Sequence, residues 1–228
     1  SNITNILLVL GITVFVGKRI IISRDIMNVD MPMLLFSAIF FYFTLIDGVF
    51  SLLEGILFVV GLIFFIASTF SDDEMEDGAE RPKVNWKNYL ILIAAGAGVS
   101  LGANYVVFAI ERISEIGGIP KEVISLSIVA LGTSLPEVFV SLAAIRKGKQ
   151  AIAVGNVLGS NIFNTYAVVG ISRLFGELKF SEQIISFNIP FMIGVTVIFA
   201  IVCFSKRISR WEGATLLLFY VYYMSTLI

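Results

Sequence analysis

Apolar residues fill long runs of this chain, and short polar segments that carry most of its charges separate them. A helix that crosses a bilayer needs about 20 mostly apolar residues. By this rule the pattern predicts eight membrane-spanning helices, and therefore an all-α, polytopic membrane protein. Their approximate limits are residues 1–16, 31–46, 49–70, 89–110, 122–145, 150–172, 184–204 and 211–227.

Composition supports a membrane protein and excludes several other classes. Of the 228 residues, 57% are hydrophobic and 14% are charged, whereas about 25% of a soluble domain is charged. The net charge is −1 without a basic cluster, which argues against nucleic-acid binding. Histidine, the commonest proton carrier near neutral pH, is absent. We expect a lipid-embedded protein that is not an enzyme and has no cofactor.

The distribution of the Lys and Arg residues among the loops predicts the orientation of the chain in the membrane. The loops on one side carry four of the sixteen, and those on the other side carry twelve. By the positive-inside rule the richer side faces the cytoplasm, so both ends of the chain are expected to be extracellular. The twelve are Lys18, Arg19, Arg24, Arg81, Lys83, Lys87, Arg146, Lys147, Lys149, Lys206, Arg207 and Arg210.

An acidic segment, residues 71–88, divides the chain into residues 1–70 and 89–228. Its acids do not have the spacing of an EF-hand calcium loop, and charge runs of this kind are typical of solvated linkers. We therefore expect a cytoplasmic linker between two structural units. The acids are Asp72, Asp73, Glu74, Glu76, Asp77 and Glu80.

The two units show an internal repeat. Residues 1–12 (SNITNILLVLGI) and 160–171 (SNIFNTYAVVGI) agree at seven positions with an offset of 159. The charge pattern makes these two spans run in opposite directions, which is typical of the inverted-topology repeats of secondary transporters. A channel could also contain such a repeat. Two further matches, at an offset of 158, pair residues 30–32 with 188–190 and residues 51–55 with 209–213.

The span 122–145 contains the first candidate ion ligands. Pro136 should break the helix and leave main-chain carbonyls such as that of Ala130 unpaired, and irregular backbone at membrane depth is tolerated where it lines a cavity. With the hydroxyls of Thr133 and Ser134 and the carboxylate of Glu137, these carbonyls form an all-oxygen set. Such a set suits hard cations such as Ca²⁺ and Na⁺. An ion-paired acid is the alternative for Glu137, but the interior of this span contains no basic residue.

The span 150–172 adds amide and hydroxyl groups. Asn164 lies four residues after Ser160, on one helical face, and Asn5 and Ser1 repeat this spacing in the other unit. Because the spacing recurs, we interpret Ser160, Asn164 and Asn5 as cation ligands.

Hydrogen bonding between helices is the alternative for the Ser and Asn residues, with Gly155 and Gly159 allowing close packing. For Asn2 and Asn161 we favour this structural role.

Two motifs carry a family resemblance. ALGTSLPE (130–137) and GNVLGSNIFN (155–164) resemble the second alpha repeat of prokaryotic-type sodium/calcium exchangers, in the Ca²⁺/cation antiporter superfamily. SNITN (1–5) is similar to the end of the first repeat. The resemblance implies ten helices, of which this chain would hold the third to the tenth, so the first two helices of the same protein are expected to complete the site. The second carboxylate is expected there.

The resemblance also implies ligand roles. Glu137 resembles the central carboxylate shared by Ca²⁺ and Na⁺, and Asn164 departs from the Asp found in some prokaryotic members and in the K⁺-dependent branch. This departure argues against K⁺ dependence and against a protonatable aspartate in the cycle. The other ligands implied are the carbonyl of Ala130 with Thr133 and Ser134, Asn5, and the outer and inner Na⁺ ligands Ser160 and Ser1.

The leading hypothesis is an electrogenic Na⁺/Ca²⁺ antiporter that works by alternating access. Two carboxylates would balance one Ca²⁺ and leave three Na⁺ with one positive charge in excess. Proton/Ca²⁺ exchange is the first alternative. A cation channel or sensor is the second, although a sensor has no need of an inverted repeat.

Overall fold

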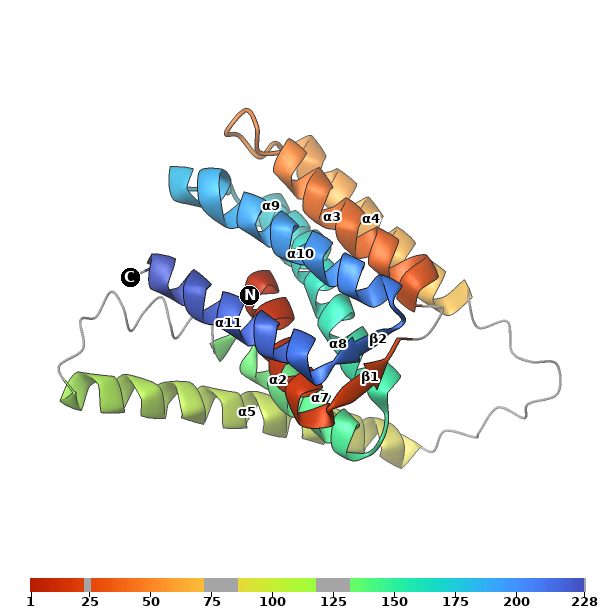
Figure 1. The fold of residues 1–228 in the computed structure, drawn as a ribbon. Coiled ribbons are helices and arrows are strands. Elements are labelled where there is room, and N and C mark those ends of the chain that lie inside the picture. The colour runs from red at the N-terminus through yellow and green to blue at the C-terminus, as the bar shows by residue number, and fades with distance from the viewer. Residues whose placement is uncertain (23–25, 72–85, 118–131, 228) are drawn as a thin grey trace.

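The computed structural model describes residues 1–22, 26–71, 86–117 and 132–227, which form mostly helices (Figure 1). Four short segments, labelled η, are π-helical. In chain order the helices are α1 (Asn2–Thr4), η1 (Asn5–Leu10), α2 (Gly11–Gly17), η2 (Ile26–Asp30), α3 (Met31–Phe43), α4 (Leu52–Ser71), α5 (Trp86–Ile116), α7 (Leu135–Arg146), α8 (Gln150–Phe163), η3 (Asn164–Val169), α9 (Gly170–Phe175), η4 (Ile184–Asn188), α10 (Ile189–Phe204) and α11 (Arg210–Leu227). The strands are β1 (Arg19–Ile21) and β2 (Arg207–Ser209).

The helical content confirms the mostly helical, polytopic fold. Among the described residues, five helical stretches are long and apolar enough to cross a membrane, and Asn2–Gly17 is a shorter apolar helix. The predicted span 122–145 is described only from Gly132, and most of the acidic linker lies outside the described residues. The five stretches are Ile26–Phe43, Leu52–Thr69, Trp86–Ala109, Gln150–Phe175 and Ile184–Phe204.

The repeat recurs in the backbone as well as in the residues. Segment η1 begins at Asn5 and η3 begins at Asn164, with the same offset of 159 and the same length of six residues. Segments η2 and η4, five residues each, are also equivalent, and a proline follows each of them closely (Pro32 and Pro190). Proline removes one helical hydrogen bond, so both units change from π to α geometry where the usual bonding is interrupted.

Helices α4 and α11 begin with the same capping box. The Ser51 main-chain nitrogen donates to Glu54 Oε2 at 2.6 Å, and the Glu54 nitrogen donates to Ser51 Oγ at 3.3 Å. In the other unit, Ser209 and Glu212 form the equivalent bonds at 2.6 and 3.4 Å. These reciprocal bonds satisfy main-chain groups that a helix start leaves open. Both carboxylates are therefore used structurally.

A two-stranded antiparallel ribbon joins the units. Arg19 pairs with Ser209, Ile20 with Ile208, and Ile21 with Arg207, although the sequence predicted loops at these positions. Strands of three residues are too short to produce a recognisable alternating pattern. The ribbon lies at the end of the bundle opposite the C-terminus (Figure 1).

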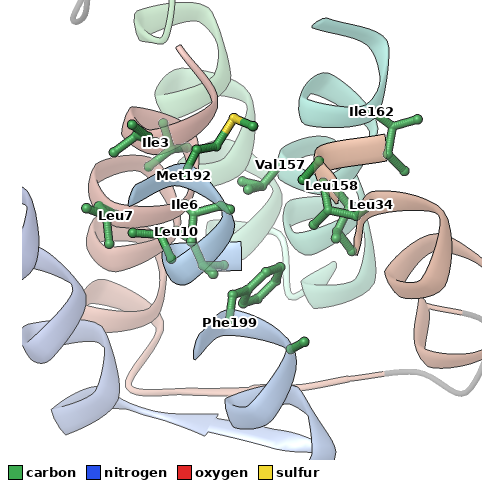
Figure 2. Close-up of a cluster of buried hydrophobic side chains, with 14 of the residues drawn as sticks. Ile3, Ile6, Leu7, Leu10, Leu34, Val157, Leu158, Ile162, Met192 and Phe199 are labelled. Atoms are coloured by element: carbon green, nitrogen blue, oxygen red, sulfur yellow. The ribbon is translucent and has the colours of Figure 1, made fainter. Parts of the chain in front are cut away.

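A buried apolar cluster fills the space between the first helix and α8 (Figure 2). The helical stretch formed by α1 and η1 therefore has one face in this core, and so does α8. The labelled members are Ile3, Ile6, Leu7 and Leu10 of α1 and η1, Val157, Leu158 and Ile162 of α8, Leu34 of α3, and Met192 and Phe199 of α10.

Glycines allow helices of one unit to pack closely against helices of the other unit. A Cβ added at Gly213 of α11 would lie 3.0 Å from the main-chain oxygen of Gly11 in α2. A Cβ added at Gly170 of α9 would lie 3.2 Å from the oxygen of Gly55 in α4. Each unit thus packs one helix tightly against a helix of the other, and the two contacts are equivalent in the repeat.

The substitution Gly213→Ala should destabilise the protein, because the new methyl group would meet the main-chain atoms Gly11 O and Phe15 N at 3.0 Å. Backbone cannot move aside as a flexible side chain can, and overpacking of this kind costs about 1–3 kcal/mol. We expect a lower midpoint of thermal unfolding in detergent. Gly194→Ala is the matched control, because no described atom lies within 4 Å of its added Cβ; an equal effect of both substitutions would contradict the packing argument.

Candidate ion-binding site

Glu137 lies in the first turn of α7, which begins at Leu135 directly after turn residues Thr133 and Ser134. Pro136 lies at the start of the helix, where its missing N–H group leaves no helical bond unmade. The described residues therefore agree with the break predicted before Pro136. The start of a helix carries a partial positive charge, which stabilises a carboxylate there.

Among the described residues, no Lys or Arg side chain forms an ion pair with the Glu137 carboxylate. Its side chain is half-buried, and its Oε2 atom is buried without a hydrogen-bond partner. Ser134 Oγ, fully buried, also lacks a partner in this part of the chain. An unsatisfied buried polar atom costs about 1–3 kcal/mol, and a charged one costs more. A cation beside the Glu137 carboxylate would remove the cost of its unpartnered oxygen.

Helix α8 presents two different faces. The residues of one face are buried in the core of Figure 2, as shown by Val157, Leu158 and Ile162. The opposite face carries Asn156 and Ser160 and continues to Asn164 of η3, and all three are half-buried. Because these three residues are four positions apart, they follow one line along the helix.

A cavity of about 370 Å³ lies between this face and the start of α7. One carboxylate, two amides and one hydroxyl therefore face the same space, with glycines leaving room between them. The lining residues are Glu137, Gly155, Asn156, Gly159, Ser160, Phe163 and Asn164.

Asn156 joins the two helices that form the cavity. Its Nδ2 atom donates to the main-chain oxygen of Glu137 at 3.3 Å and to Ser141 Oγ at 3.0 Å. Ser141 Oγ in turn donates to the Ala153 oxygen at 3.3 Å. These bonds hold the residue that carries the carboxylate at a fixed height against α8.

Asn5 and Asn164 occupy equivalent positions in the two repeats, but only Asn164 is among the residues that line the cavity. Asn5 is fully buried, its Nδ2 atom donates to Asn161 Oδ1 at 2.9 Å, and its Oδ1 atom has no partner among the described residues. Asn164 Nδ2 donates to Ser1 Oγ at 3.2 Å and to Asn2 Oδ1 at 3.1 Å. The interhelical hydrogen bonding expected of Asn2 and Asn161 is confirmed.

The other predicted ligands lie as follows. Ser160 lines the cavity, Ser1 contacts Asn164, and Thr133 is an exposed turn residue. Ala130 lies outside the described residues. Our choice of ligands omitted Asn156, although its position four residues before Ser160 was a readable signal. Phe163, also omitted, had no such signal among the many phenylalanines of the chain.

Other hollows in the described part of the chain are less suited to a cation. One, of about 490 Å³, is lined by Lys18, Arg19 and Arg207 beside Glu212, whose carboxylate is used in the capping box. Another, of about 470 Å³, has no charged residue in its lining. Within the described residues, no three His, Cys, Asp or Glu side chains gather as a metal cluster. The Glu137 cavity therefore offers one carboxylate with neutral oxygen donors.

The sequence profile of the family described as "Sodium/calcium exchanger protein" matches residues 1–70 and 87–228. The chain belongs to the sodium/calcium exchanger family. It is therefore a multi-pass membrane protein from a family of transporters rather than of enzymes.

Known relatives of this exchanger-family chain include archaeal proteins. The sodium/calcium exchanger MaX1 of Methanosarcina acetivorans is 40% identical over 142 residues, which cover 62% of this chain and 41% of MaX1. The uncharacterized membrane protein MJ0091 of Methanocaldococcus jannaschii is 31% identical over 232 residues, covering 100% and 74% of the two chains. The matches thus span less than half of MaX1 and about three quarters of MJ0091.

A solved structure of the sodium-calcium exchanger NCX_Mj has the same fold. It matches with a TM-score of 0.83 at 28% identity, and the match covers 100% of this chain and 74% of that one. This likeness confirms the exchanger-like helical bundle predicted from the sequence.

The substitution Gly159→Val should close the cavity without disturbing the fold. No described atom lies within 4 Å of a Cβ added at Gly159, so the new side chain would occupy the cavity itself. We expect the apparent affinity for Ca²⁺, measured by equilibrium dialysis, to fall by about tenfold or more, equivalent to about 1.4 kcal/mol. Gly194→Val is the matched control on an exposed helix face. Unchanged affinity in the Gly159 variant would show that this cavity does not bind the ion.

Proposed function

We propose that this chain belongs to a secondary-active antiporter that exchanges Na⁺ for Ca²⁺ across the cell membrane by alternating access. The observation that carries the proposal is the Glu137 carboxylate, which has a buried, unpartnered oxygen in the wall of a cavity lined by amide and hydroxyl groups. Membership of the exchanger family supports the same function.

The donor chemistry favours hard cations as the transported substrates. Ca²⁺ binds carboxylate, carbonyl and amide oxygens, whereas soft metals prefer thiolates or imidazoles. Glu137, Ser160 and Asn164, whose side chains all carry oxygen, line one cavity, and Cys203 is buried elsewhere, in α10. We assign the ligand set as Glu137, Ser134, Thr133, Ala130, Ser160, Asn164, Asn5 and Ser1.

Competition for a single carboxylate provides the coupling. A site built around Glu137 is electrostatically satisfied by a cation and costly when it is empty at membrane depth. Exchange requires that one ion replaces the other at Glu137 before the site changes from facing one side of the membrane to facing the other side. With more Na⁺ charge moved than Ca²⁺ charge, transport is electrogenic.

The orientation follows from the charges. The ribbon end of the bundle, with Lys18, Arg19, Lys206 and Arg207, faces the cytoplasm in this proposal. Both chain ends are then extracellular, and the acidic linker 71–88 connects the two inverted units on the cytoplasmic side.

Proton/Ca²⁺ exchange is less well supported. The chain has no histidine, and the position equivalent to Asn5 in the second repeat is Asn164, which cannot take up a proton near neutral pH. The named relative MaX1 and the NCX_Mj structure are described as sodium/calcium exchangers. A Ca²⁺ flux driven by a pH gradient in the absence of Na⁺ would favour the alternative.

The substitution Glu137→Gln tests the assigned role, because it removes the charge and keeps the size of the side chain. We expect Na⁺-driven ⁴⁵Ca²⁺ uptake into Na⁺-loaded proteoliposomes to fall by more than about tenfold, as lost ion binding exceeds about 1.4 kcal/mol.

Glu212→Gln is the matched control for that experiment. Glu212 lies in a capping box, where glutamine also serves, so uptake should remain close to that of the unsubstituted protein. Undiminished uptake in the Glu137 variant would rule out its role.

A further inference from the structure

Asn2 and Asn161 bond to each other in a reciprocal way. Asn2 Nδ2 donates to the main-chain oxygen of Asn161 at 3.3 Å, and Asn161 Nδ2 donates to the main-chain oxygen of Asn2 at 3.3 Å. The two residues are equivalent in the repeat, at an offset of 159. A main-chain carbonyl can only accept a hydrogen bond. The amide nitrogens of both side chains must therefore face these carbonyls, which determines the orientation of both amides.

This orientation determines what the two amides present to their neighbours. Each has its oxygen free to accept, and each accepts from a predicted ion ligand of the opposite repeat. Asn161 Oδ1 accepts from Asn5 Nδ2 at 2.9 Å, and Asn2 Oδ1 accepts from Asn164 Nδ2 at 3.1 Å. The nitrogen of each predicted ligand is thus held by an asparagine of the other repeat.

The oxygens of the two ligand amides are left for another partner. Asn5 Oδ1 is buried without a partner among the described residues. Asn164 lines the cavity, and its nitrogen donates to Ser1 Oγ as well as to Asn2. A cation needs the amide oxygen, because a rotated amide would present two N–H donors to a positive charge.

We propose that Asn161 and Asn2 are positioning residues that hold the amides of Asn5 and Asn164 with their oxygens toward the transported ion. This inference rests on the proposed function, since it assigns a role in the same site. Each holding residue belongs to the repeat opposite to its ligand, so the orientation of one ligand depends on contact between the two units.

A role limited to helix packing would make a different prediction. Packing needs the hydrogen bonds, but not a particular orientation of the amides of Asn5 and Asn164. A carboxylate in place of the ligand amide separates the positioning role from the packing role. Both oxygens of a carboxylate are acceptors, so either one can face the cation whichever way the group is rotated. The orientation effect should vanish in such a background, whereas a packing effect should persist.

The test measures ⁴⁵Ca²⁺ binding to the purified full-length protein by equilibrium dialysis. Asn161→Leu should weaken binding by about tenfold or more, as the loss of a ligand-orienting partner commonly does. In the Asn5→Asp background the same substitution should weaken binding by less than about threefold.

Thr13→Val is the matched control. Thr13 Oγ1 donates to the main-chain oxygen of Val9 at 2.6 Å and is equally buried, but this hydrogen bond involves none of the four asparagines. Its removal should change Ca²⁺ affinity little in either background.

Asn2→Leu tests the equivalent pair, Asn2 and Asn164. Its effect on Ca²⁺ binding is measured alone and in the Asn164→Asp background, and this comparison replaces the first one if the Asn161 variant does not fold. Equal losses in both backgrounds would overturn the positioning role and leave Na⁺/Ca²⁺ exchange standing. Ca²⁺ binding without Na⁺-driven uptake by the unsubstituted protein would instead overturn the proposed exchange, while the binding comparison would still decide the positioning role.

Discussion

The described structure depends on one electrostatic constraint, an acid in the wall of a cavity whose charge no other described side chain balances. Glu137 has a buried oxygen without a hydrogen-bond donor among the described residues, and such a group is costly unless a cation binds beside it. The surrounding features address this cost. The start of α7 provides a favourable dipole, Asn156 holds the main chain of Glu137 against α8, and the glycines at 155 and 159 leave space for an ion.

The repeat provides the geometry that this constraint needs. Equivalent π segments begin at Asn5 and Asn164, and π segments inside helices are frequent at functional sites. The crossed contacts of Gly11 with Gly213 and of Gly55 with Gly170 pack the units against one another. A site formed from both units is therefore held by a framework in which neither unit packs alone.

Much of this arrangement could be predicted from the sequence, and the failures have physical causes. Apolar runs of about 20 residues located the helices, and Pro136 indicated the break before Glu137, because both effects depend on local chemistry. The ribbon at 19–21 and 207–209 escaped prediction because its two strands are remote in sequence and too short to show a pattern. Glu54 and Glu212 were equivalent in the repeat, but only the structure shows that their carboxylates bond to helix starts.

The asparagines show most clearly where sequence reasoning ends. Spacing identifies Asn5 and Asn164 as ligand candidates and leaves a structural role between helices for Asn2 and Asn161. Spacing cannot show which way an amide points, because its oxygen and nitrogen differ only in the partners around them. The main-chain carbonyls of Asn2 and Asn161 supply that information across the repeat. A residue that joins two helices can therefore also determine which atom of its neighbour meets the ion, and in this chain the two roles belong to the same hydrogen bonds.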